Sequence, residues 1–297
     1  MAKGYVLYNP IAGNGDCEAK VKVLSSILSD PLEYLDITKI SDYGSFLSGL
    51  AEEDYIIVVG GDGTINRFIN NTAAITIEQD IMYYPMGSGN DFARELSSEP
   101  FTAPVSIKKY MEILPEVEVN GKRYRFINGV GYGIDGYCCQ VGDELRAIPG
   151  KKVDYTGIAI KGLLFHFKPR NAKITIDGQE YSYNKVWLAP AMHGKYYGGG
   201  MIPTPGQDRM NPDGSLSVLV FHAGGKLRTL CAFPSIFKGE HIKYKKMVKL
   251  HTGHCIRVEF DRPTPLQVDG ETILDVTSYA AYSPAYLASE HKEPALV

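Results

Sequence analysis

The sequence predicts a protein of the α/β plus all-β class, with a helix-covered parallel sheet over residues 1–115 and a β-sandwich over residues 116–282. Its length is the first observation, because 297 residues correspond to two domains of about 150 residues each. The second is an alternation of short apolar strands and helical stretches in the first part of the chain. The third is a series of strands with Asn-Gly and Asp-Gly turns in the remainder. The final segment, residues 283–297, is compatible with either domain.

The first domain is predicted from the spacing of its apolar residues. Residues 54–59 contain the run Tyr-Ile-Ile-Val-Val, which is typical of a strand buried on both faces. The predicted strands are Gly4–Tyr8, Tyr34–Ile37, Asp54–Val59 and Ile81–Tyr84, and the predicted helices are residues 17–29, 42–52 and 64–71. Parallel sheets bind ligands at the carboxyl ends of their strands. We therefore expect a site at the turns Asn9-Pro10, Gly60–Gly63 and Gly87–Asn90.

The second domain is predicted from strands that follow one another without regular helices between them. Turn dipeptides separate or flank these strands at positions 120–121, 177–178, 213–214 and 269–270. Helical insertions are predicted at residues 151–166 and 226–238. The predicted strands are Val117–Val119, Tyr124–Asn128, Lys173–Ile176, Lys185–Ala189, Ser215–Phe221, Cys255–Phe260 and Thr264–Val268.

Composition excludes several classes of protein. The formal net charge is −3, so a general affinity for nucleic acid is not expected. The 5 cysteines are an odd number without a C-x-x-C pair, which favours reduced thiols in the cytoplasm over disulfides or a four-cysteine zinc site. The N-terminus lacks the apolar segment of a signal peptide, and no run approaches the ~20 apolar residues of a membrane span. If the protein uses a lipid, it must meet the membrane from the water side.

The segment Gly60-Gly61-Asp62-Gly63-Thr64 lies between a predicted buried strand and a predicted helix. Glycine lets backbone N–H groups approach an anion closely, and the helix presents its N-terminus to the same place. A carboxylate at Asp62 suits a site where Mg²⁺ bridges phosphates or where a hydroxyl is activated. The alternative is a tight structural turn in which Asp62 caps a helix.

A second turn, Pro85–Arg94, has the same character, with glycines for close approach and Asn90 and Asp91 for polar contacts. Two such turns on adjacent strand ends converge on one site, which makes the pair more specific than either turn alone. No G-x-x-x-x-G-K-[ST] segment is present, and the first strand is not followed by G-x-G-x-x-G. The sequence thus predicts a phosphate site that is neither a Walker loop nor a dinucleotide fingerprint.

These motifs resemble those of the diacylglycerol kinase catalytic domain family, which includes bacterial lipid kinases, sphingosine kinases and ceramide kinases, and the resemblance covers nearly the whole chain. The two Gly-rich turns match G-G-D-G-T-x-N and P-x-G-T-x-N-D-F-x-R, with Ser88 in place of Thr. The opening loop at Asn9-Pro10, the threonine Thr38 after the second strand and Lys161-Gly162 also match. In the second domain, the matching segments are Asn128 with Gly131–Asp135, Asp213-Gly214 and Gln267–Glu271.

The resemblance implies a phosphofructokinase-like nucleotide domain followed by a β-sandwich, with the active site in the cleft between them. It implies transfer of the γ-phosphate of ATP to a lipid hydroxyl with Mg²⁺, most simply from ATP to diacylglycerol. Asp62 is then the central catalytic carboxylate, Asp91 supports the magnesium and water network, and Glu271 is the general base. Taken alone, Glu271 also fits a solvent-facing hairpin residue. The residues implied along the nucleotide are Asn9, Thr38, Gly60, Gly61, Gly63, Thr64, Asn66, Gly87, Ser88, Gly89 and Asn90.

Three implied metal ligands carry different roles. Asp62 meets the catalytic Mg²⁺ directly or through water, and Glu118 is a candidate member of the same network in place of the family's usual Asp. Asp213 is a candidate ligand of a structural Mg²⁺, with a plain Asp-Gly turn as the alternative. Two further positions depart from the family pattern, because Asn14 replaces a frequent basic residue and Arg67 replaces a frequent Glu.

The expected partner is a lipid substrate at the membrane surface, contacted peripherally by a cytoplasmic protein, and the resemblance is compatible with a homodimer. The basic run of residues 238–249 suits anionic lipid, with a solvated loop as the alternative. Tyr196, Tyr197 and Tyr244 are candidates for lipid contact, and the loop around His193 and Gly198–Gly200 is a candidate to flank the substrate. His251 and His254 are not expected to bind zinc, because their spacing on a strand places them on opposite faces.

Two rival functions stay open at this point. An NAD kinase shares G-G-D-G-T and an inter-domain site, although the segment G-S-G-N-D-F-A-R favours the lipid family. A non-catalytic nucleotide or lipid sensor on the same fold is the second rival, against which the retained carboxylates argue. The sequence does not identify the lipid, because lipids of this kind are bound mainly through apolar contacts.

Overall fold

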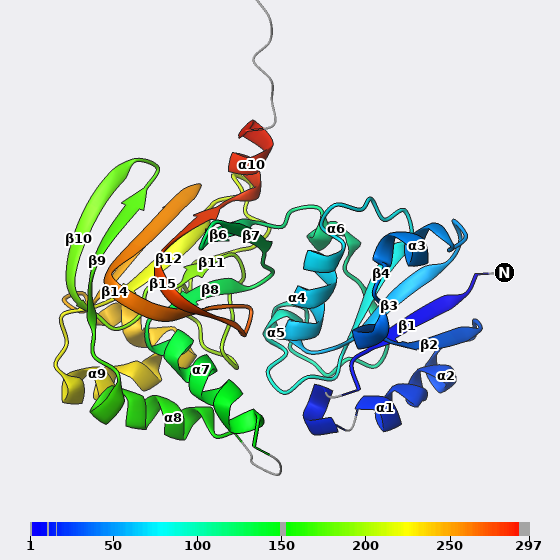
Figure 1. Cartoon of the computed structure of the whole chain (residues 1–297), viewed down its shortest axis with the longest axis horizontal. Coiled ribbons are helices and arrows are strands. Elements are labelled where there is room, and N and C mark those ends of the chain that lie inside the picture. Colours follow the sequence, from blue (N-terminus) through cyan, green and yellow to red (C-terminus); the bar gives the residue numbers. More distant parts are fainter. Residues whose placement is uncertain (1, 11, 16, 149–152, 291–297) are drawn as a thin grey trace, which may run out of the picture. The chain divides into compact units, whose positions relative to one another are not determined.

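The computed structural model describes residues 2–10, 12–15, 17–148 and 153–290, which form two compact units, Met1–Leu114 and Pro115–Val297 (Figure 1). The side chain of Asn14, residues 151–152 of the predicted helical insertion and residues 291–297 of the final segment lie outside the described part. No helix within these described ranges is both long and apolar enough to cross a bilayer.

Unit 1 contains a sheet of five strands in the order β2-β1-β3-β4-β5. The four longer strands are parallel, as predicted, whereas the two-residue edge strand β5 is antiparallel to β4. The strands are β1 (Gly4–Tyr8), β2 (Leu32–Asp36), β3 (Tyr55–Gly60), β4 (Asp80–Pro85) and β5 (Val105–Ser106). The edge strand was not predicted, because two residues between prolines and lysines carry no periodic signal.

Successive side chains of β3 point to opposite faces of the sheet, and nearly all of them are buried. Both faces of the sheet are therefore covered. Ile57 and Val59 pack with Cys17, Val21 and Leu24 of the N-terminal helices in one cluster. The helices of unit 1 are α1 (Cys17–Lys20), α2 (Leu24–Ile27), α3 (Tyr43–Ser48), α4 (Asp62–Asn71), α5 (Asp91–Leu96) and α6 (Lys108–Met111), with 3-10 turns at η1 (Ala12–Gly15), η2 (Val21–Val23) and η3 (Ile37–Lys39). The predicted helix 42–52 is shorter, because Gly49 ends it.

Unit 2 is a β-sandwich whose described strand pairs are all antiparallel, which confirms the predicted all-β second part. Its strands are β6 (Glu116–Val119), β7 (Lys122–Arg125), β8 (Gly129–Tyr132), β9 (Arg170–Ile176), β10 (Gln179–Val186), β11 (Ala191–Met192), β12 (Leu216–Phe221), β13 (Val248–Gly253), β14 (Cys255–Val268) and β15 (Glu271–Tyr282). The predicted strand Lys185–Ala189 is wrong in its limits, because β10 ends at Val186 in an irregular stretch.

The long strand β14 joins the two layers of the sandwich. Its first half, Ile256–Phe260, pairs with β9, and its second half, Leu266–Val268, pairs with β8. Register shifts between residues 259 and 266 in its pairing with β15 let the strand bend from one layer to the other. The sequence analysis divided this strand in two, because Pro263 and Pro265 interrupt its hydrophobic pattern.

Most helical segments of unit 2 lie to one side of its strands, at the bottom of the view in Figure 1, and one helix follows the last strand. They are α7 (Ile134–Arg146), α8 (Tyr155–Lys161), the π-helical turn η4 (Gly162–His166), α9 (Lys226–Ala232), the 3-10 turns η5 (Phe233–Lys238) and η6 (Glu240–Lys243), and α10 (Pro284–Glu290). Helix α10 follows Ser283, whose N–H donates to the carbonyl of His254 at 2.8 Å. The described part of the final segment therefore belongs to unit 2.

Candidate active site

The two Gly-rich turns of unit 1 lie against each other at the carboxyl ends of β3 and β4. The N–H of Met86 donates to the carbonyl of Gly60 at 2.9 Å. A Cβ atom added to Gly87 would lie 2.3 Å from the Cα of Gly61, so the two backbones touch and neither turn tolerates a side chain at this contact. The turns thereby form one backbone-lined surface, as the sequence analysis expected from their positions on adjacent strands.

The opening loop after β1 joins the same place. The side-chain amide of Asn9 donates to the hydroxyl of Thr64 at 3.4 Å, and the N–H of Asn9 donates to the carbonyl of Val59 at 3.2 Å. Gly13 has a φ of +61°, and a Cβ atom at this position would lie 2.7 Å from the carbonyl oxygen of Met86. Three turns from three parallel strands therefore converge.

Asp62 begins helix α4 and holds helix α5. One carboxylate oxygen accepts the N–H of Asp91 at 2.9 Å, and the other accepts the N–H of Phe92 at 2.9 Å. Asp62 is therefore a cap, as one sequence interpretation proposed, but of the neighbouring helix rather than of its own. Each carboxylate oxygen has more than one lone pair, so these two hydrogen bonds leave Asp62 able to accept from a ligand or water.

Tyr83, which was not predicted as a site residue, contacts the first Gly-rich turn from the strand β4. Its ring is fully buried, and its hydroxyl donates to the carbonyl of Gly60 at 3.1 Å. Burial is the main reason why the pKa of Tyr83 lies well above its ordinary value, and the nearby carboxylates of Asp62 and Asp91 add to it. The phenol therefore stays protonated and keeps the O–H that donates to Gly60. A strand residue of this type carries no motif, so no sequence signal distinguishes it from an ordinary core tyrosine.

Asn90 shapes the second turn. It has a φ of +51°, and its side chain both accepts the N–H of Gly87 at 2.9 Å and donates to the carbonyl of Gly87 at 2.8 Å. The Nε of Arg94 donates to the carbonyl of Gly89 at 3.1 Å. Ser88, at the tip, is exposed. The loop is thus held by its own side chains, and the predicted contact of Asn90 with a nucleotide stays a prediction.

Three further residues predicted to contact the nucleotide, Thr38, Asn66 and Gly63, lie outside the contact between the two Gly-rich turns. Thr38 is exposed in η3, where its hydroxyl and N–H both donate to Asp36, at 2.6 and 2.9 Å. Asn66 is buried one turn into α4, with its carbonyl accepting from the side chain of Asn70 at 2.9 Å. Gly63 lies in the first turn of α4, where the N–H groups of a helix point out of its N-terminal end. The structure therefore groups Asn9, Thr64 and the two Gly-rich turns most tightly.

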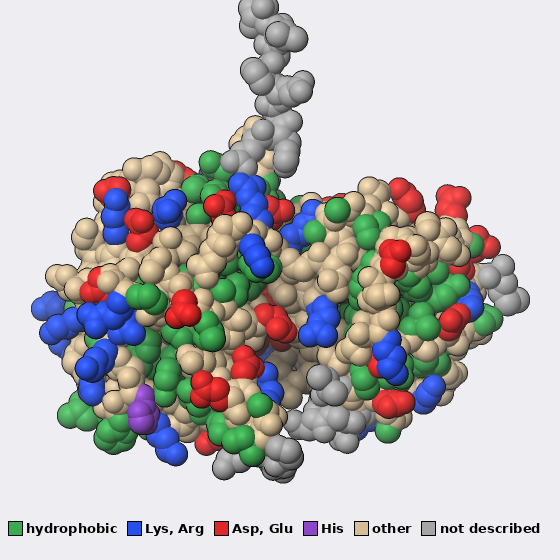
Figure 2. All heavy atoms as spheres, in the orientation of Figure 1, with side chains coloured by type: hydrophobic (Ala, Val, Ile, Leu, Met, Phe, Trp, Pro, Cys, Tyr) green, Lys and Arg blue, Asp and Glu red, His purple; other side chains and the backbone are tan. Residues whose placement is uncertain are grey.

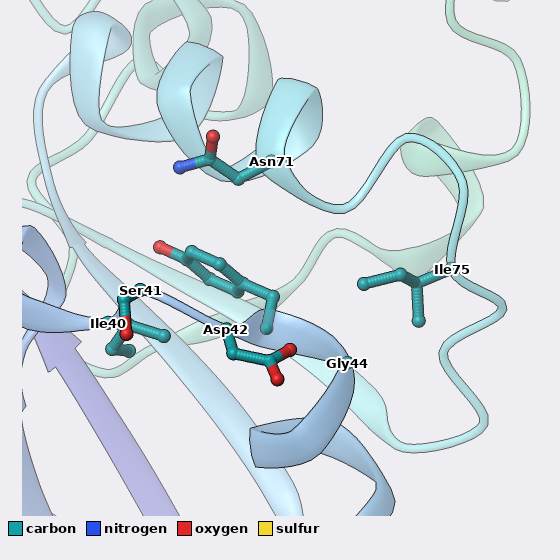
Figure 3. A pocket seen from close by; sticks show the side chains of 7 residues that line it. Ile40, Ser41, Asp42, Gly44, Asn71 and Ile75 are labelled. Carbon is teal, nitrogen blue, oxygen red and sulfur yellow. The ribbon is translucent and has the colours of Figure 1, made fainter.

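An open pocket of about 300 Å³ lies elsewhere in unit 1, between the start of α3 and the end of α4 (Figure 3). Its lining residues are Ile40, Ser41, Asp42, Tyr43, Gly44, Asn71 and Ile75. None of them belongs to a Gly-rich turn. In Figure 3 Asn71 comes from the end of a helix above the pocket, and Ile75 lies on the loop beyond it.

Glu271 lies in unit 2 on a hairpin turn. Asp269 and Gly270 have φ values of +48° and +97°, and Val268 pairs with Glu271 across the turn between β14 and β15. The side-chain oxygen of Gln267 accepts the N–H of Gly270 at 2.6 Å, which fixes the turn. The Glu271 side chain itself is exposed. Its carboxylate is therefore open to solvent, on a turn whose backbone is held by hydrogen bonds.

Asp269 anchors this hairpin, a role that sequence reasoning missed. Its carboxylate is 8% exposed and accepts three backbone N–H groups, from Ile127 at 2.6 Å, Asn128 at 2.8 Å and Gly129 at 3.0 Å. The signal was present, because Asp269 precedes Gly270 in the late V-D-G-E motif. The sequence assigned chemistry to the Glu of that motif and left the Asp as a turn residue.

Buried Arg209 and His193 hold the same segment from other sides. The guanidinium of Arg209 donates to the carbonyl of Ile127 and, at 3.1 Å, to the side-chain oxygen of Asn128. The N–H groups of His193 and Gly194 both donate to the carbonyl of Asn128 at 2.9 Å. Burial, with Arg209 nearby, lowers the pKa of His193 well below its ordinary value, so its ring is neutral. His193 is thus buried within unit 2, and the proposal that its loop flanks a substrate stays a prediction.

A second buried carboxylate, Asp135, opens helix α7. A Cβ atom added to Gly131 would lie 1.6 Å from its carboxylate, which explains the glycine in this part of the motif. Burial raises the pKa of Asp135 to about 6. Tyr197, a candidate for lipid contact, is 3% exposed beside Asp135 and so cannot reach a membrane surface.

The predicted metal ligands are spread over the chain. Within the described ranges, no three His, Cys, Asp or Glu side chains form a group that could hold a metal ion. Asp213 accepts the N–H and the hydroxyl of Ser215, at 3.1 and 2.9 Å, which lowers the pKa of its carboxyl. Glu118 in β6 lies 3.5 Å from the Nε of Arg123. The magnesium assignments of these residues stay predictions.

His251 and His254, which were not expected to bind zinc, each have a hydroxyl as hydrogen-bond partner. The ring of His251 lies 2.7 Å from the hydroxyl of Tyr183, and Nδ1 of His254 lies 3.0 Å from the hydroxyl of Ser283. His254 falls between β13 and β14 rather than within one strand.

Comparison with known proteins identifies the class to which this geometry belongs. Residues 3–118 match the diacylglycerol kinase catalytic domain, and residues 128–289 match the YegS C-terminal NAD kinase beta sandwich-like domain. The two matches follow the same order as the α/β unit and the β-sandwich. The chain therefore belongs to the family of diacylglycerol kinases and related lipid kinases, which confirms the resemblance drawn from its motifs.

Individual relatives agree with this assignment. A diacylglycerol kinase of Mycobacterium tuberculosis (strain ATCC 25618 / H37Rv) is 27% identical over 259 residues, covering 82% of this chain and 81% of its own. A protein of Staphylococcus aureus (strain MRSA252) named as a lipid kinase is 28% identical over 266 residues, covering 85% of this chain and 81% of its own. The solved structure of a diacylglycerol kinase from Bacillus anthracis str. Sterne has a TM-score of 0.63 at 24% identity, over 96% of this chain and 95% of that one, and so shares the fold.

Proposed function

We propose that this lipid kinase transfers the γ-phosphate of ATP to a lipid hydroxyl with Mg²⁺, and that diacylglycerol is the acceptor. The convergence of three glycine-containing turns around Asp62 carries the proposal. Their backbones approach closely enough to exclude side chains, which is how phosphate groups are bound through N–H groups. The relatives named diacylglycerol kinase support the choice of acceptor.

In this reaction the bond between the γ-phosphorus and the oxygen bridging to the β-phosphate breaks, and a bond from the γ-phosphorus to the lipid oxygen forms. The proton of the lipid hydroxyl passes to a carboxylate, for which we propose the exposed Glu271. Asp62 fits a magnesium site because its carboxylate provides hard oxygen donors beyond its two hydrogen bonds. When bound, Mg²⁺ would neutralise phosphate charge, while the turns orient the phosphates and Asn90 fixes the shape of the second turn.

The test is transfer of label from [γ-³²P]ATP to a panel of lipid alcohols, with NAD included as a rival acceptor. We expect label in phosphatidic acid when diacylglycerol is supplied, and a loss of about 10²–10⁴-fold in kcat for Glu271→Gln. Glu259→Gln removes another carboxylate from the same sandwich and is the matched control. Label in NAD but in no lipid would assign the protein to the rival function, and unchanged kcat in Glu271→Gln would remove the proposed base.

A further inference from the structure

The two most exposed large hydrophobic side chains in the described ranges lie on one surface of unit 2. Leu227, in α9, is 74% exposed, and Phe165, in η4, is 71% exposed. The Nζ of Lys226 donates to the carbonyl of Leu164 at 2.6 Å, and this bond joins the residues immediately before the two exposed side chains. Neighbouring exposed apolar side chains of this size indicate an interaction surface rather than scattered surface residues.

The local helix geometry turns these side chains outward. Helix α8 ends in a π-helical turn, closed by the N–H of Phe167 donating to the carbonyl of Gly162 at 2.8 Å. Leu163 and Phe167 are buried in the core beneath, so the widened turn leaves Phe165 on the outside. Phe237, at 48%, and Ile242, at 46%, extend the exposed apolar set along η5 and η6.

Basic side chains lie among these apolar ones. Residues 226–249 contain seven Lys and Arg but a single acidic residue, Glu240, although the whole chain carries a net charge of −3. An open hollow of about 320 Å³ on this surface is lined by Arg228, Lys243, Tyr244, Lys245, Lys246 and Met247. Figure 2 shows blue and green side chains gathered over the part of unit 2 where Figure 1 places α8 and α9.

Three of the four cations that line the hollow carry uncompensated charge within the described part of the chain. Lys243 lies 3.2 Å from Glu240 and so is paired within the protein. In the described part of the chain, no carboxylate lies within ion-pair distance of Arg228, Lys245 or Lys246, and all three are exposed. Their charges can therefore be neutralised only by something outside this chain's described residues.

We propose that this surface docks on a bilayer containing acidic phospholipid. We call it the α9 surface and define it by Phe165, Leu227, Phe237, Ile242, Arg228, Lys245 and Lys246. The four apolar side chains enter the boundary between headgroups and acyl chains, and the hollow receives the phosphate of an acidic lipid. Apolar side chains beside unpaired cations are the pattern of interfacial membrane binding, because the two parts meet acyl chains and anionic headgroups at one depth. A nucleic acid would leave the apolar set in water, and a protein partner would bury it without needing so many adjacent cations.

Vesicle co-sedimentation without nucleotide tests the proposal, and its result is independent of the kinase activity proposed above. We expect the wild type to bind 70:30 phosphatidylcholine:phosphatidylglycerol vesicles far more tightly than phosphatidylcholine vesicles. The triple variant R228Q/K245Q/K246Q should bind the anionic vesicles about 100-fold more weakly, at about fivefold per cation removed. The double variant F165S/L227S should bind both kinds of vesicle at least about tenfold more weakly.

Matched controls come from the sandwich. K122Q/K173Q/R257Q removes the same charge from exposed strand positions, and L274S removes an apolar side chain that is 50% exposed in β15. Both controls should bind anionic vesicles like the wild type. Equal loss in the controls and in the α9-surface variants would overturn the proposal, as would equal wild-type binding to both kinds of vesicle. Release of the protein from anionic vesicles by millimolar inorganic phosphate, beyond the effect of chloride at the same ionic strength, would assign the hollow to a free anion and also overturn it.

Discussion

The dipeptide Asp-Gly occurs at Asp62-Gly63 in unit 1 and at Asp269-Gly270 in unit 2. The two aspartates make the same kind of hydrogen bond, but they differ in how deeply they are buried. Each carboxylate accepts backbone N–H groups from a segment distant in sequence, two in the case of Asp62 and three in the case of Asp269. Asp62 is only partly buried at the mouth of the Gly-rich turns, whereas Asp269 is 8% exposed. Both aspartates therefore anchor a distant segment, and only the carboxylate of Asp62 is also partly exposed to solvent.

The difference also explains where chemistry is placed in unit 2. The carboxylate of Asp269 accepts three backbone N–H groups of residues 127–129, and these hydrogen bonds anchor the hairpin. Few of its lone pairs remain to accept hydrogen bonds from a substrate. The exposed carboxylate of Glu271 lies two residues further on, at the start of β15. One late motif thus combines an acid that anchors the fold with an exposed acid that we propose as the base.

The largest expected effect is on Asp269. Asp269→Ala leaves three buried backbone N–H groups without their acceptor and should lower the free energy of unfolding by about 4 kcal/mol. Asp177 provides the matched control, because it also accepts backbone N–H groups, from His254 and Cys255, but is exposed. Asp177→Ala should cost only about 1 kcal/mol, since water replaces the lost acceptor. Urea unfolding measures both, and equal losses would contradict the importance of burial.

A pH effect follows from Asp135, a second buried carboxylate of unit 2. Burial raises its pKa from 3.8 to about 6, so the fold favours the protonated form. The free energy of unfolding should therefore fall by about 2 kcal/mol as the pH rises from about 4 to about 6. Cys138 beside it, with a pKa of about 12, stays neutral over this range.

The variant Asp135→Asn should lack this fall, because its amide does not ionise. Urea unfolding between pH 4 and pH 7 compares the two proteins, with the difference between them isolating Asp135 from other titrating groups. Parallel curves for wild type and variant would show that Asp135 is ionised in the fold at pH 4.

Substitution of the partly buried Asp62 should affect stability less than substitution of Asp269 and should affect catalytic activity strongly. Asp62→Ala removes two hydrogen bonds at the N-terminus of α5 and should lower the free energy of unfolding by about 1–2 kcal/mol, while abolishing measurable lipid phosphorylation. Asp42 caps α3 by accepting the N–H of Ser45 at 3.0 Å, so Asp42→Ala should cost similar stability and keep activity. Loss of activity in both variants would mean that Asp62 acts through stability alone.

The smallest effect is expected at Tyr83. Tyr83→Phe removes the hydrogen bond to the carbonyl of Gly60 and should lower the free energy of unfolding by about 1 kcal/mol, because a buried acceptor loses one donor. Tyr84→Phe, at the next position of β4, should be within about 0.5 kcal/mol of the wild type. Thermal unfolding of the two variants tests this, and a Tm for Tyr83→Phe as high as that of Tyr84→Phe would remove the role assigned to this hydroxyl.

Prediction from sequence succeeded where a local pattern was strong. The apolar run of β3 and the glycines after it placed both the sheet and the converging turns of unit 1. The helix α7 and the strand β15 were not predicted. Gly136 and Gly142 obscure the helical pattern of α7, and a Cβ atom at Gly136 would lie 2.0 Å from the carbonyl oxygen of Pro265. A side chain at position 136 would therefore clash with β14, and the local sequence does not reveal this contact.

Periodicity and short motifs are local properties, so the printed chain was enough to predict the class of fold, the family and the residue types at the carboxyl ends of the strands. Three features became visible only in the folded chain: Asp62 caps α5, Asp269 binds the backbone of residues 127–129, and Phe165 and Leu227 share a surface. The contact between Asp269 and Ile127 spans 142 positions in the chain. Burial and hydrogen bonding over such separations depend on how the whole chain packs, so they assign different roles to identical Asp-Gly dipeptides.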